Sequence, residues 1–218
     1  MGGVAPLKNI AGFIRSDSKS KASILNQQFS SVFTREPTGN LPDKGPSSHP
    51  CMSSFTVMEP GVRKLLQNLN CHKAAGPDKI PTRFLHLAAD DLAPILTLLY
   101  QFSLDFSEVP RDWRGANVVS IYKKEDTHIP TNYRSVSLTS ITCKILEHIV
   151  HSNIMSHFDT NHILRDNQHG FRKRRLCETQ LLTTIGSIAK QLSAGNKVDA
   201  ILMDLGKAFD KIPHSRLI

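Results

Sequence analysis

The chain has 218 residues, of which 39% are apolar, so it is long enough to bury the core of one sizeable domain. No apolar stretch approaches the roughly 20 residues that a membrane span needs, and residues 1–18 lack the apolar block of a secretory signal. We therefore expect an intracellular protein of the cytoplasm or nucleus. The net charge of +8 makes a polyanion the natural partner, although a solvated basic surface that binds nothing specific is equally compatible. The four widely separated cysteines predict reduced thiols.

The first part of the chain is predicted to be helical on either side of one linker. Residues 21–33 carry apolar side chains at helical spacing. Residues 36–54 are rich in Pro, Gly, Ser and Asn, which indicates a flexible connection. A short amphipathic helix over 62–69 is entered through Pro60, and the sequence Gly-Pro-Asp over 76–78 is typical of a turn.

Two further helices are expected over 82–89 and 92–106. The second should use its regularly spaced apolar residues for packing, namely Ile95, Leu98, Leu99 and Phe102. After Trp113 the hydrophobic period changes, and residues 117–122 are predicted to form a strand.

The second half of the chain alternates between helices and loops before a final strand. Ser140 is expected to cap a long helix whose apolar rows extend to Ile154. Another helix is predicted over 178–192 and is closed by Gly195. Residues 200–203 are predicted to be a buried strand. Helices with few, well-separated strands indicate an α+β fold.

Asp204 follows that last strand and is the candidate metal ligand. A carboxylate held rigidly at the end of a strand suits Mg²⁺, a hard cation that prefers oxygen ligands. The alternative is an Asp that caps a helix beginning near Lys207. Two-metal phosphoryl transfer needs carboxylates from more than one segment, and this chain shows one, so the sequence indicates part of an enzyme.

Four blocks of sequence occur in an order that is shared with a known family. They are residues 73–81 (Lys-Ala-Ala-Gly-Pro-Asp-Lys-Ile-Pro), 132–138 (Asn-Tyr-Arg-Ser-Val-Ser-Leu), 168–172 (Gln-His-Gly-Phe-Arg) and 199–210, which contains Asp204. With these blocks the chain resembles the reverse transcriptases of non-LTR retrotransposons. The Cys-Glu-Thr-Gln wording at 177–180 is most similar to the jockey-like branch. The segment from Pro6 to Phe33 resembles the connector between the endonuclease and the polymerase of such elements.

This resemblance implies the fingers and partial palm of a right-hand polymerase, truncated before the second catalytic carboxylate motif. It divides the chain into a connector helix over 1–35, the flexible linker over 36–54, and the fingers and partial palm over 55–218. Asp90-Asp91 superficially imitates the Tyr-x-Asp-Asp block that is absent after Asp204. It lies upstream, lacks the aromatic residue and falls between two helical patterns. Without the hairpin that carries that block, the strand over 200–203 lacks a partner, so we expect it to be loosely ordered.

The resemblance also implies roles at the catalytic centre. Asp204 would be the catalytic metal ligand, and Phe209 the aromatic residue that excludes a ribose 2′-hydroxyl, with a core Phe as the alternative. Lys123, Lys124 and Arg134 would grip the triphosphate, because cationic donors neutralise charge that develops in phosphoryl transfer. For the two lysines a solvated strand end is equally compatible.

A loop near the third block is expected to touch the template. A glycine there permits close approach of backbone to nucleic acid, and a guanidinium suits phosphate. The expected nucleic-acid-binding residues are Gln168, Gly170, Arg172, Lys173, Arg174 and Arg175. The chain departs from the family wording in three places, which look like drift in a decaying copy. Ser135 stands where Pro is usual, Gly206 where Ser is usual, and Arg-Arg-Leu over 174–176 where Gly-Arg-Ser is common.

The expected function is therefore that of a fragment of an RNA-directed DNA polymerase. Its complete relatives copy RNA into DNA with Mg²⁺ and deoxynucleoside triphosphates, with an RNA template and a DNA primer as partners. The chain alone is expected to be inactive. The alternative is a noncatalytic nucleic-acid-binding remnant of a mobile element, which the net charge and the missing carboxylates favour. An interaction protein that uses only its apolar helices has no positive sequence signal.

Overall fold

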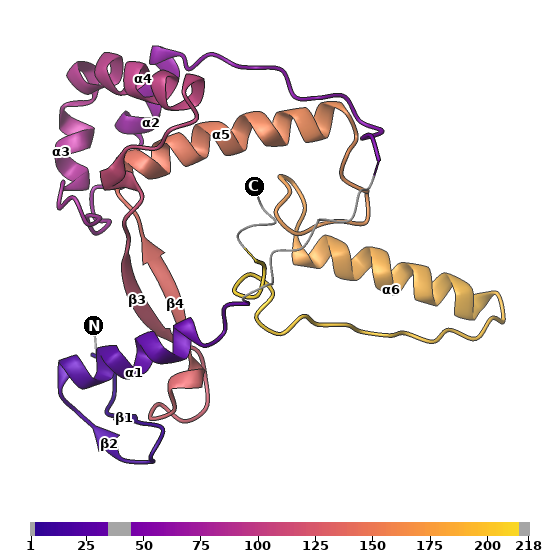
Figure 1. Cartoon of the computed structure of the whole chain (residues 1–218). Coiled ribbons are helices and arrows are strands. Elements are labelled where there is room, and N and C mark those ends of the chain that lie inside the picture. The colour runs from indigo at the N-terminus through magenta and orange to yellow at the C-terminus, as the bar shows by residue number, and fades with distance from the viewer. Residues whose placement is uncertain (1–2, 35–44, 214–218) are drawn as a thin grey trace. The chain divides into compact units, whose positions relative to one another are not determined.

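The structure, a computed structural model, describes residues 3–34 and 45–213 and confirms the α+β class (Figure 1). Two compact units make up the described chain: residues 3–34, 53–153 and 207–213 form one, and residues 45–52 and 154–206 form the other. In chain order the helices and strands are β1 (Leu7–Lys8), β2 (Ile14–Arg15), α1 (Ser18–Ser30), α2 (Glu59–Gln67), α3 (Thr82–Leu87), α4 (Ala89–Asp105), η1 (Arg111–Trp113), β3 (Asn117–Tyr122), η2 (Pro130–Asn132), β4 (Tyr133–Leu138), α5 (Ile141–Thr160) and α6 (Cys177–Ser193).

Helix α1 confirms the predicted first helix but begins earlier, because Asp17 caps it. The Asp17 carboxylate accepts a hydrogen bond from the Ser20 backbone N–H at 2.8 Å. This hydrogen bond lowers the pKa of Asp17. Of the expected linker over 36–54, residues 36–44 lie outside the described residues, and residues 45–54 form neither helix nor strand.

The main core of the first unit is built by α2, α3, α4 and the first half of α5. Its fully buried side chains include Val62, Leu66, Ala93 and Tyr100. The Tyr100 hydroxyl donates a hydrogen bond to the Thr142 carbonyl at 2.8 Å, which satisfies a buried polar group and ties α4 to α5. All four helices in this core were predicted from the sequence.

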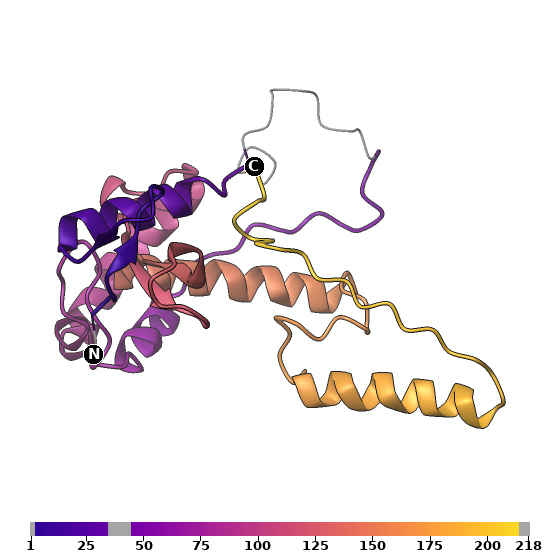
Figure 2. The same cartoon turned by 90° about the horizontal axis from the view of Figure 1, so that it is seen from below.

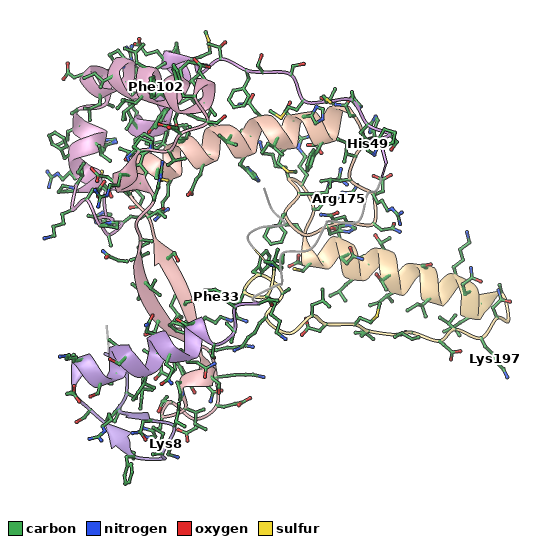
Figure 3. The ribbon with its side chains drawn as sticks, viewed as in Figure 1. Lys8, Phe33, His49, Phe102, Arg175 and Lys197 are labelled. Carbon is green, nitrogen blue, oxygen red and sulfur yellow. The ribbon has the colours of Figure 1, made fainter. Side chains whose placement is uncertain are left out.

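The face of α4 that packs is the opposite of the one predicted, so that expectation was wrong. The predicted residues Ile95, Leu98, Leu99 and Phe102 are between 44% and 73% exposed, and Phe102 is labelled in Figure 3. The buried row runs through Ala89, Ala93, Leu96, Tyr100 and Ser103. Both rows have helical spacing, so periodicity does not distinguish them. The row with small alanines packs, because small side chains let the neighbouring α2 approach closely.

The predicted turn over 76–78 is confirmed, and its packing explains why a glycine stands at position 76. The Lys79 backbone N–H donates to the Gly76 carbonyl at 3.1 Å. A Cβ atom on Gly76 would lie 2.6 Å from the Cα atom of Ser140 and 2.7 Å from the Thr139 carbonyl oxygen. The turn therefore packs backbone against backbone where α5 begins, and only a residue without a side chain fits there.

Helix α5 begins as the sequence predicts, at a serine cap. The Ser140 hydroxyl accepts a hydrogen bond from the Cys143 backbone N–H at 3.1 Å, and Ser140 is fully buried. The buried residues of α5 all lie in its first two turns. Burial also raises the pKa of the Cys143 thiol to about 11, with the nearby Glu147 carboxylate contributing.

The C-terminal part of the described chain contains one predicted helix and lacks one predicted strand. Helix α6 forms as predicted. Gly195 follows it with φ of 80°, which confirms the prediction that this glycine ends the helix. The prediction of a buried strand over 200–203 was wrong, because these residues form no strand and Ile201, Leu202 and Met203 are 86% to 93% exposed. A strand needs a neighbour to accept its backbone hydrogen bonds, and none pairs with this segment in the part of the chain that the structure describes.

Candidate nucleotide and nucleic-acid interface

Strands β3 and β4 form an antiparallel hairpin that carries two of the predicted triphosphate-binding residues (Figure 1). Ile121 pairs with Arg134, and beyond the strand end the Lys123 backbone N–H donates to the Asn132 carbonyl at 2.8 Å. Side chains alternate between the faces of a strand, so Lys123 and Arg134 share one face. Their side chains are diagonal neighbours on it. The structure therefore brings these two cationic residues together.

That face of the hairpin is open to solvent. Its apolar members Val119, Ile121 and Val136 are 37% to 52% exposed. Lys123 and Arg134 are also exposed, and neither forms an ion pair within the described ranges 3–34 and 45–213. Lys124 differs, because its ammonium lies 3.6 Å from the Glu125 carboxylate in the turn. Two free cations thus stand on one exposed face, and the third candidate is already paired.

The turn between the two strands is held by side chains that were not among the predicted site residues. The Asp126 carboxylate accepts from the His128 backbone N–H at 2.8 Å, which is the main cause of the lowered pKa of Asp126. The Asn132 amide donates to the Asp126 carbonyl at 2.9 Å. The Tyr133 hydroxyl donates to the Thr127 carbonyl at 2.7 Å. Asp and Asn often bond the nearby backbone in turns, so a sequence signal for this turn was present.

Strand β4 was also missed, although its block of sequence was recognised. Tyr133–Leu138 has no clean alternation of apolar and polar residues, and most of its side chains are exposed. Its pairing with β3 defines it, through a ladder that runs from Asn117 opposite Leu138 to Tyr122 opposite Tyr133. When most side chains of a strand are exposed, its sequence shows no clear hydrophobic pattern. Such a strand is recognised only from its pairing with a neighbouring strand.

The expected template loop lies in the second unit, and two of its three arginines are engaged there. Arg172 donates to the Arg165 carbonyl at 3.1 Å and lies 3.6 Å from Asp159. Arg175, labelled in Figure 3 just before α6, lies 3.3 Å from Asp166. Arg172 is half-buried by these contacts.

The remaining residues of this loop face solvent. Lys173 and Arg174 are exposed and make no ion pair with any described residue. Gln168 and Gly170 are exposed too, and a Cβ atom on Gly170 would meet nothing within 4 Å. Among the described residues, Lys173 and Arg174 are therefore the unpaired cations of the loop, and no contact requires a glycine at position 170.

Asp204 and Phe209 lie in an exposed segment. The Asp204 side chain is exposed, and Phe209 is 77% exposed. No helix begins near Lys207 in the described chain. The Lys211 backbone N–H donates to the Lys207 carbonyl at 3.1 Å and closes a turn, so a helix-capping role for Asp204 has no helix to cap. The core alternative for Phe209 is not supported by its exposure.

A divalent metal does not fit the described residues by themselves. No group of three or more His, Cys, Asp or Glu side chains capable of holding an ion occurs in residues 3–34 and 45–213. Mg²⁺ takes several oxygen ligands, and Asp204 supplies one carboxylate. Among the same residues, no helix is long and apolar enough to cross a membrane.

Comparison with known proteins shows what the chain is similar to. Residues 121–218 match the family described as reverse transcriptase (RNA-dependent DNA polymerase). The chain is 26% identical over 170 residues to the RNA-directed DNA polymerase from mobile element jockey of Drosophila melanogaster, across 77% of this chain and 18% of that protein. It is 25% identical over 158 residues to the probable RNA-directed DNA polymerase from transposon BS of the same species, across 72% and 17%. The chain resembles the reverse transcriptases of non-LTR retrotransposons.

A similar match, 24% identical over 162 residues, is found with the probable RNA-directed DNA polymerase from transposon X-element of Drosophila melanogaster. The chain is thus similar to a part of such polymerases and spans 17% to 18% of the length of these curated relatives. Every predicted site residue falls inside the matched range 121–218. Reverse transcriptases in general use a divalent metal, a nucleic-acid template and primer, and nucleotides.

Proposed function

We propose that this chain forms the fingers and the first part of the palm of a mobile-element RNA-directed DNA polymerase, where it grips the incoming deoxynucleoside triphosphate and the RNA template. One observation carries the proposal. Lys123 and Arg134 lie on one exposed face of the β3–β4 hairpin, inside the range that matches the reverse transcriptase family, and neither is ion-paired in the described chain. Two unpaired cations at neighbouring positions suit the adjacent charges of a triphosphate.

The proposal assigns the remaining hairpin and palm residues as follows. Lys124 contacts the triphosphate only after its ion pair with Glu125 is broken, so it contributes the least of the three cations to triphosphate affinity. Phe209 lies under the sugar and disfavours a ribose. Asp204 is the catalytic carboxylate, and it would hold Mg²⁺ together with further carboxylates that a longer polypeptide supplies. The metal would provide charge neutralisation at the phosphates.

The template side of the proposal rests on the second unit. Lys173 and Arg174 bind phosphates of the RNA template and DNA primer first, because they are exposed and unpaired among the described residues. Arg172 and Arg175 hold the loop through Asp159 and Asp166 and add weaker contacts. Gln168 and Gly170 present backbone and amide to the template. Residues 55–218 then form the polymerase part, residues 1–35 the connector and residues 36–54 the linker, in the cytoplasm or nucleus.

Triphosphate binding tests this function directly. A deoxynucleoside triphosphate is titrated into the full chain, and the backbone amide resonances of β3 and β4 are followed by NMR. Removal of either hairpin cation, in Lys123→Ala or Arg134→Ala, is expected to weaken binding about tenfold, which corresponds to about 1.4 kcal/mol. Lys124→Ala is the matched control and should change the affinity far less. Equal effects in all three variants would show a diffuse basic surface instead of a site.

Nucleic-acid binding tests the loop. Affinity for a single-stranded RNA should fall with salt, and each phosphate contact adds about 0.7 to the slope of log affinity against log salt. The double variant of Lys173 and Arg174 to alanine should lower that slope by about 1.4, whereas the double variant of Arg172 and Arg175 should lower it less. An unchanged slope in the first variant would place the RNA surface elsewhere.

The second candidate function is a noncatalytic nucleic-acid-binding remnant. It is favoured by the absence of a metal-binding group of side chains among the described residues. Primer extension on an RNA template with Mg²⁺ separates the two candidates. Extension by a longer polypeptide that contains this chain, abolished by Asp204→Ala, would support the polymerase. If every longer polypeptide binds nucleic acid but extends no primer, the result would support a noncatalytic nucleic-acid-binding remnant.

A further inference from the structure

Residues 3–34 pack against the end of the hairpin that carries its turn, inside the same unit (Figures 1 and 2). Leu7 of β1 is 0% exposed, Leu25 of α1 is 7% exposed, and both cluster with Tyr133 of β4, which is 8% exposed. Tyr133 is the residue before Arg134. The N-terminal segment therefore buries the hairpin at the position next to one of its two free cations.

Polar contacts join the same two parts. The Lys8 backbone N–H donates to the His128 carbonyl at 2.8 Å. Nδ1 of His128 lies 2.6 Å from the Pro6 carbonyl oxygen. A carbonyl only accepts, so Nδ1 carries the proton and donates. The Lys8 ammonium, labelled in Figure 3, adds a longer contact of 3.7 Å to Asp126.

These contacts continue through the turn to Lys123. His128 donates its backbone N–H to the Asp126 carboxylate, and the Asp126 carbonyl accepts from the Asn132 amide. The Asn132 carbonyl then accepts the backbone N–H of Lys123 at 2.8 Å. A short series of hydrogen bonds thus runs from the N-terminal segment to the backbone of Lys123.

The contact is concentrated at the turn. Farther along the hairpin, Lys21 and Phe29 of α1 and Val118 and Ser120 of β3 line an open cavity of about 490 Å³. An isolated two-stranded hairpin is marginally stable in water and needs packing against another element. In residues 3–34 and 45–213, β3 and β4 pair only with each other. Residues 3–34 supply this packing at the end of the hairpin that carries Lys123 and Arg134.

We propose that residues 3–34 are a brace that holds the hairpin turn, so that Lys123 and Arg134 stand at a fixed separation for a triphosphate. Lys8, through its backbone N–H, and His128, through its ring, are positioning residues. The triphosphate part rests on the proposed function. A braced pair of cations binds more tightly than a mobile pair, because less conformational entropy is lost on binding.

Two variants of one residue test the brace in the full chain. Lys8→Pro removes the backbone donor to His128, and the preceding Leu7 of β1 is already extended, as the residue before a proline prefers to be. Lys8→Ala keeps that donor and removes only the exposed contact to Asp126. Without ligand, hydrogen exchange of the Lys123 and Ile121 amides should accelerate about tenfold or more in Lys8→Pro and stay near wild type in Lys8→Ala. Unchanged exchange in Lys8→Pro would overturn the brace whatever the hairpin binds.

The same variants are then titrated with a deoxynucleoside triphosphate. Affinity should fall about fivefold in Lys8→Pro and less than about twofold in Lys8→Ala. His128→Ala should behave like Lys8→Pro, and His128→Asn should restore affinity, because its amide N–H replaces the Nδ1 donor to Pro6. Unchanged exchange at Tyr100 and Ile145 shows that the main core has not unfolded.

The outcomes separate the brace from the proposed function. If Lys123→Ala and Arg134→Ala weaken triphosphate binding and Lys8→Pro does not, the proposed function stands and the positioning role is overturned. If neither of those two alanine variants affects binding although Lys8→Pro loosens the hairpin, the proposed function fails, and the positioning role for a triphosphate fails with it.

Discussion

The two units of the described chain differ in how much they bury. The unit built on α2, α3, α4 and the start of α5 contains fully buried side chains such as Leu66 and Tyr100. In the other unit no described residue between 154 and 206 is buried, and α6 presents Leu181, Leu182, Ile185 and Leu192 at 57% to 73% exposure. The template loop and Asp204 lie in this second unit. Two of the four blocks shared with the reverse transcriptases, residues 168–172 and most of 199–210, therefore lie in the unit without buried residues, whereas residues 73–81 and 132–138 belong to the packed unit.

The largest difference is expected for truncation of leucine in the two units. Leu66→Ala removes a fully buried side chain of α2, leaves a cavity in the main core and should lower the free energy of unfolding by about 2–5 kcal/mol. Leu182→Ala is the matched control on α6, where the side chain is 73% exposed, and should change it by less than about 0.5 kcal/mol. Urea denaturation followed by tryptophan fluorescence measures both. Equal losses would mean that α6 is packed as firmly as α2.

Glycine-to-alanine changes should differ in sign. Gly76→Ala forces a Cβ against the Ser140 backbone, which has little room to move, and should destabilise the first unit by about 1–3 kcal/mol. On α6 the control Gly186→Ala meets nothing within 4 Å and should stabilise the helix by up to about 1 kcal/mol, because alanine is the better helix former. Thermal unfolding reports the first change and far-UV circular dichroism the second. A neutral Gly76→Ala would contradict the close packing of the turn on α5.

The smallest difference concerns the helix caps. Ser140→Ala removes a buried acceptor for the Cys143 backbone N–H and should cost about 1–2 kcal/mol of stability. The exposed Thr179 hydroxyl accepts the Leu176 backbone N–H at 3.0 Å where α6 begins, so Thr179→Ala should cost about 0.5 kcal/mol and fray only that helix. Amide exchange of Cys143 and Leu176 checks the two sites separately. Global unfolding in Thr179→Ala would show that α6 and the main core unfold together.

Local signals in the sequence were sufficient for most helices. Ser140 was recognisable as a cap from its residue type and the apolar rows that follow it, and Gly195 as a closure from its place after a helical pattern. The observed helix boundaries differed from the predicted ones where a capping side chain lies before the apolar pattern. Asp17, for example, caps α1 ahead of its first apolar residue. Caps and periodicity depend on residues close together in the chain, which is why they can be predicted.

Tertiary contacts decided what depends on distant residues. The sequence marked Lys123 and Arg134 as candidates, but their common face follows from the register of β3 with β4, and β4 itself has no clear pattern. Which face of α4 packs also depended on its neighbour, because Ala93 and Leu98 lie on two rows with equal periodicity.

By itself the sequence determined the α+β class, the positions of the helices, and the resemblance to reverse transcriptases through the blocks that contain Arg134, Arg172 and Asp204. Only the tertiary structure decided which cations are free, since Arg172 and Arg175 are engaged by Asp159 and Asp166 while Lys123 and Arg134 are unpaired in the described chain. It also decided that Lys8 and His128 meet at the hairpin turn. Hydrophobic spacing and caps act over a few residues, whereas pairing of charges and strands depends on residues that only the fold brings together.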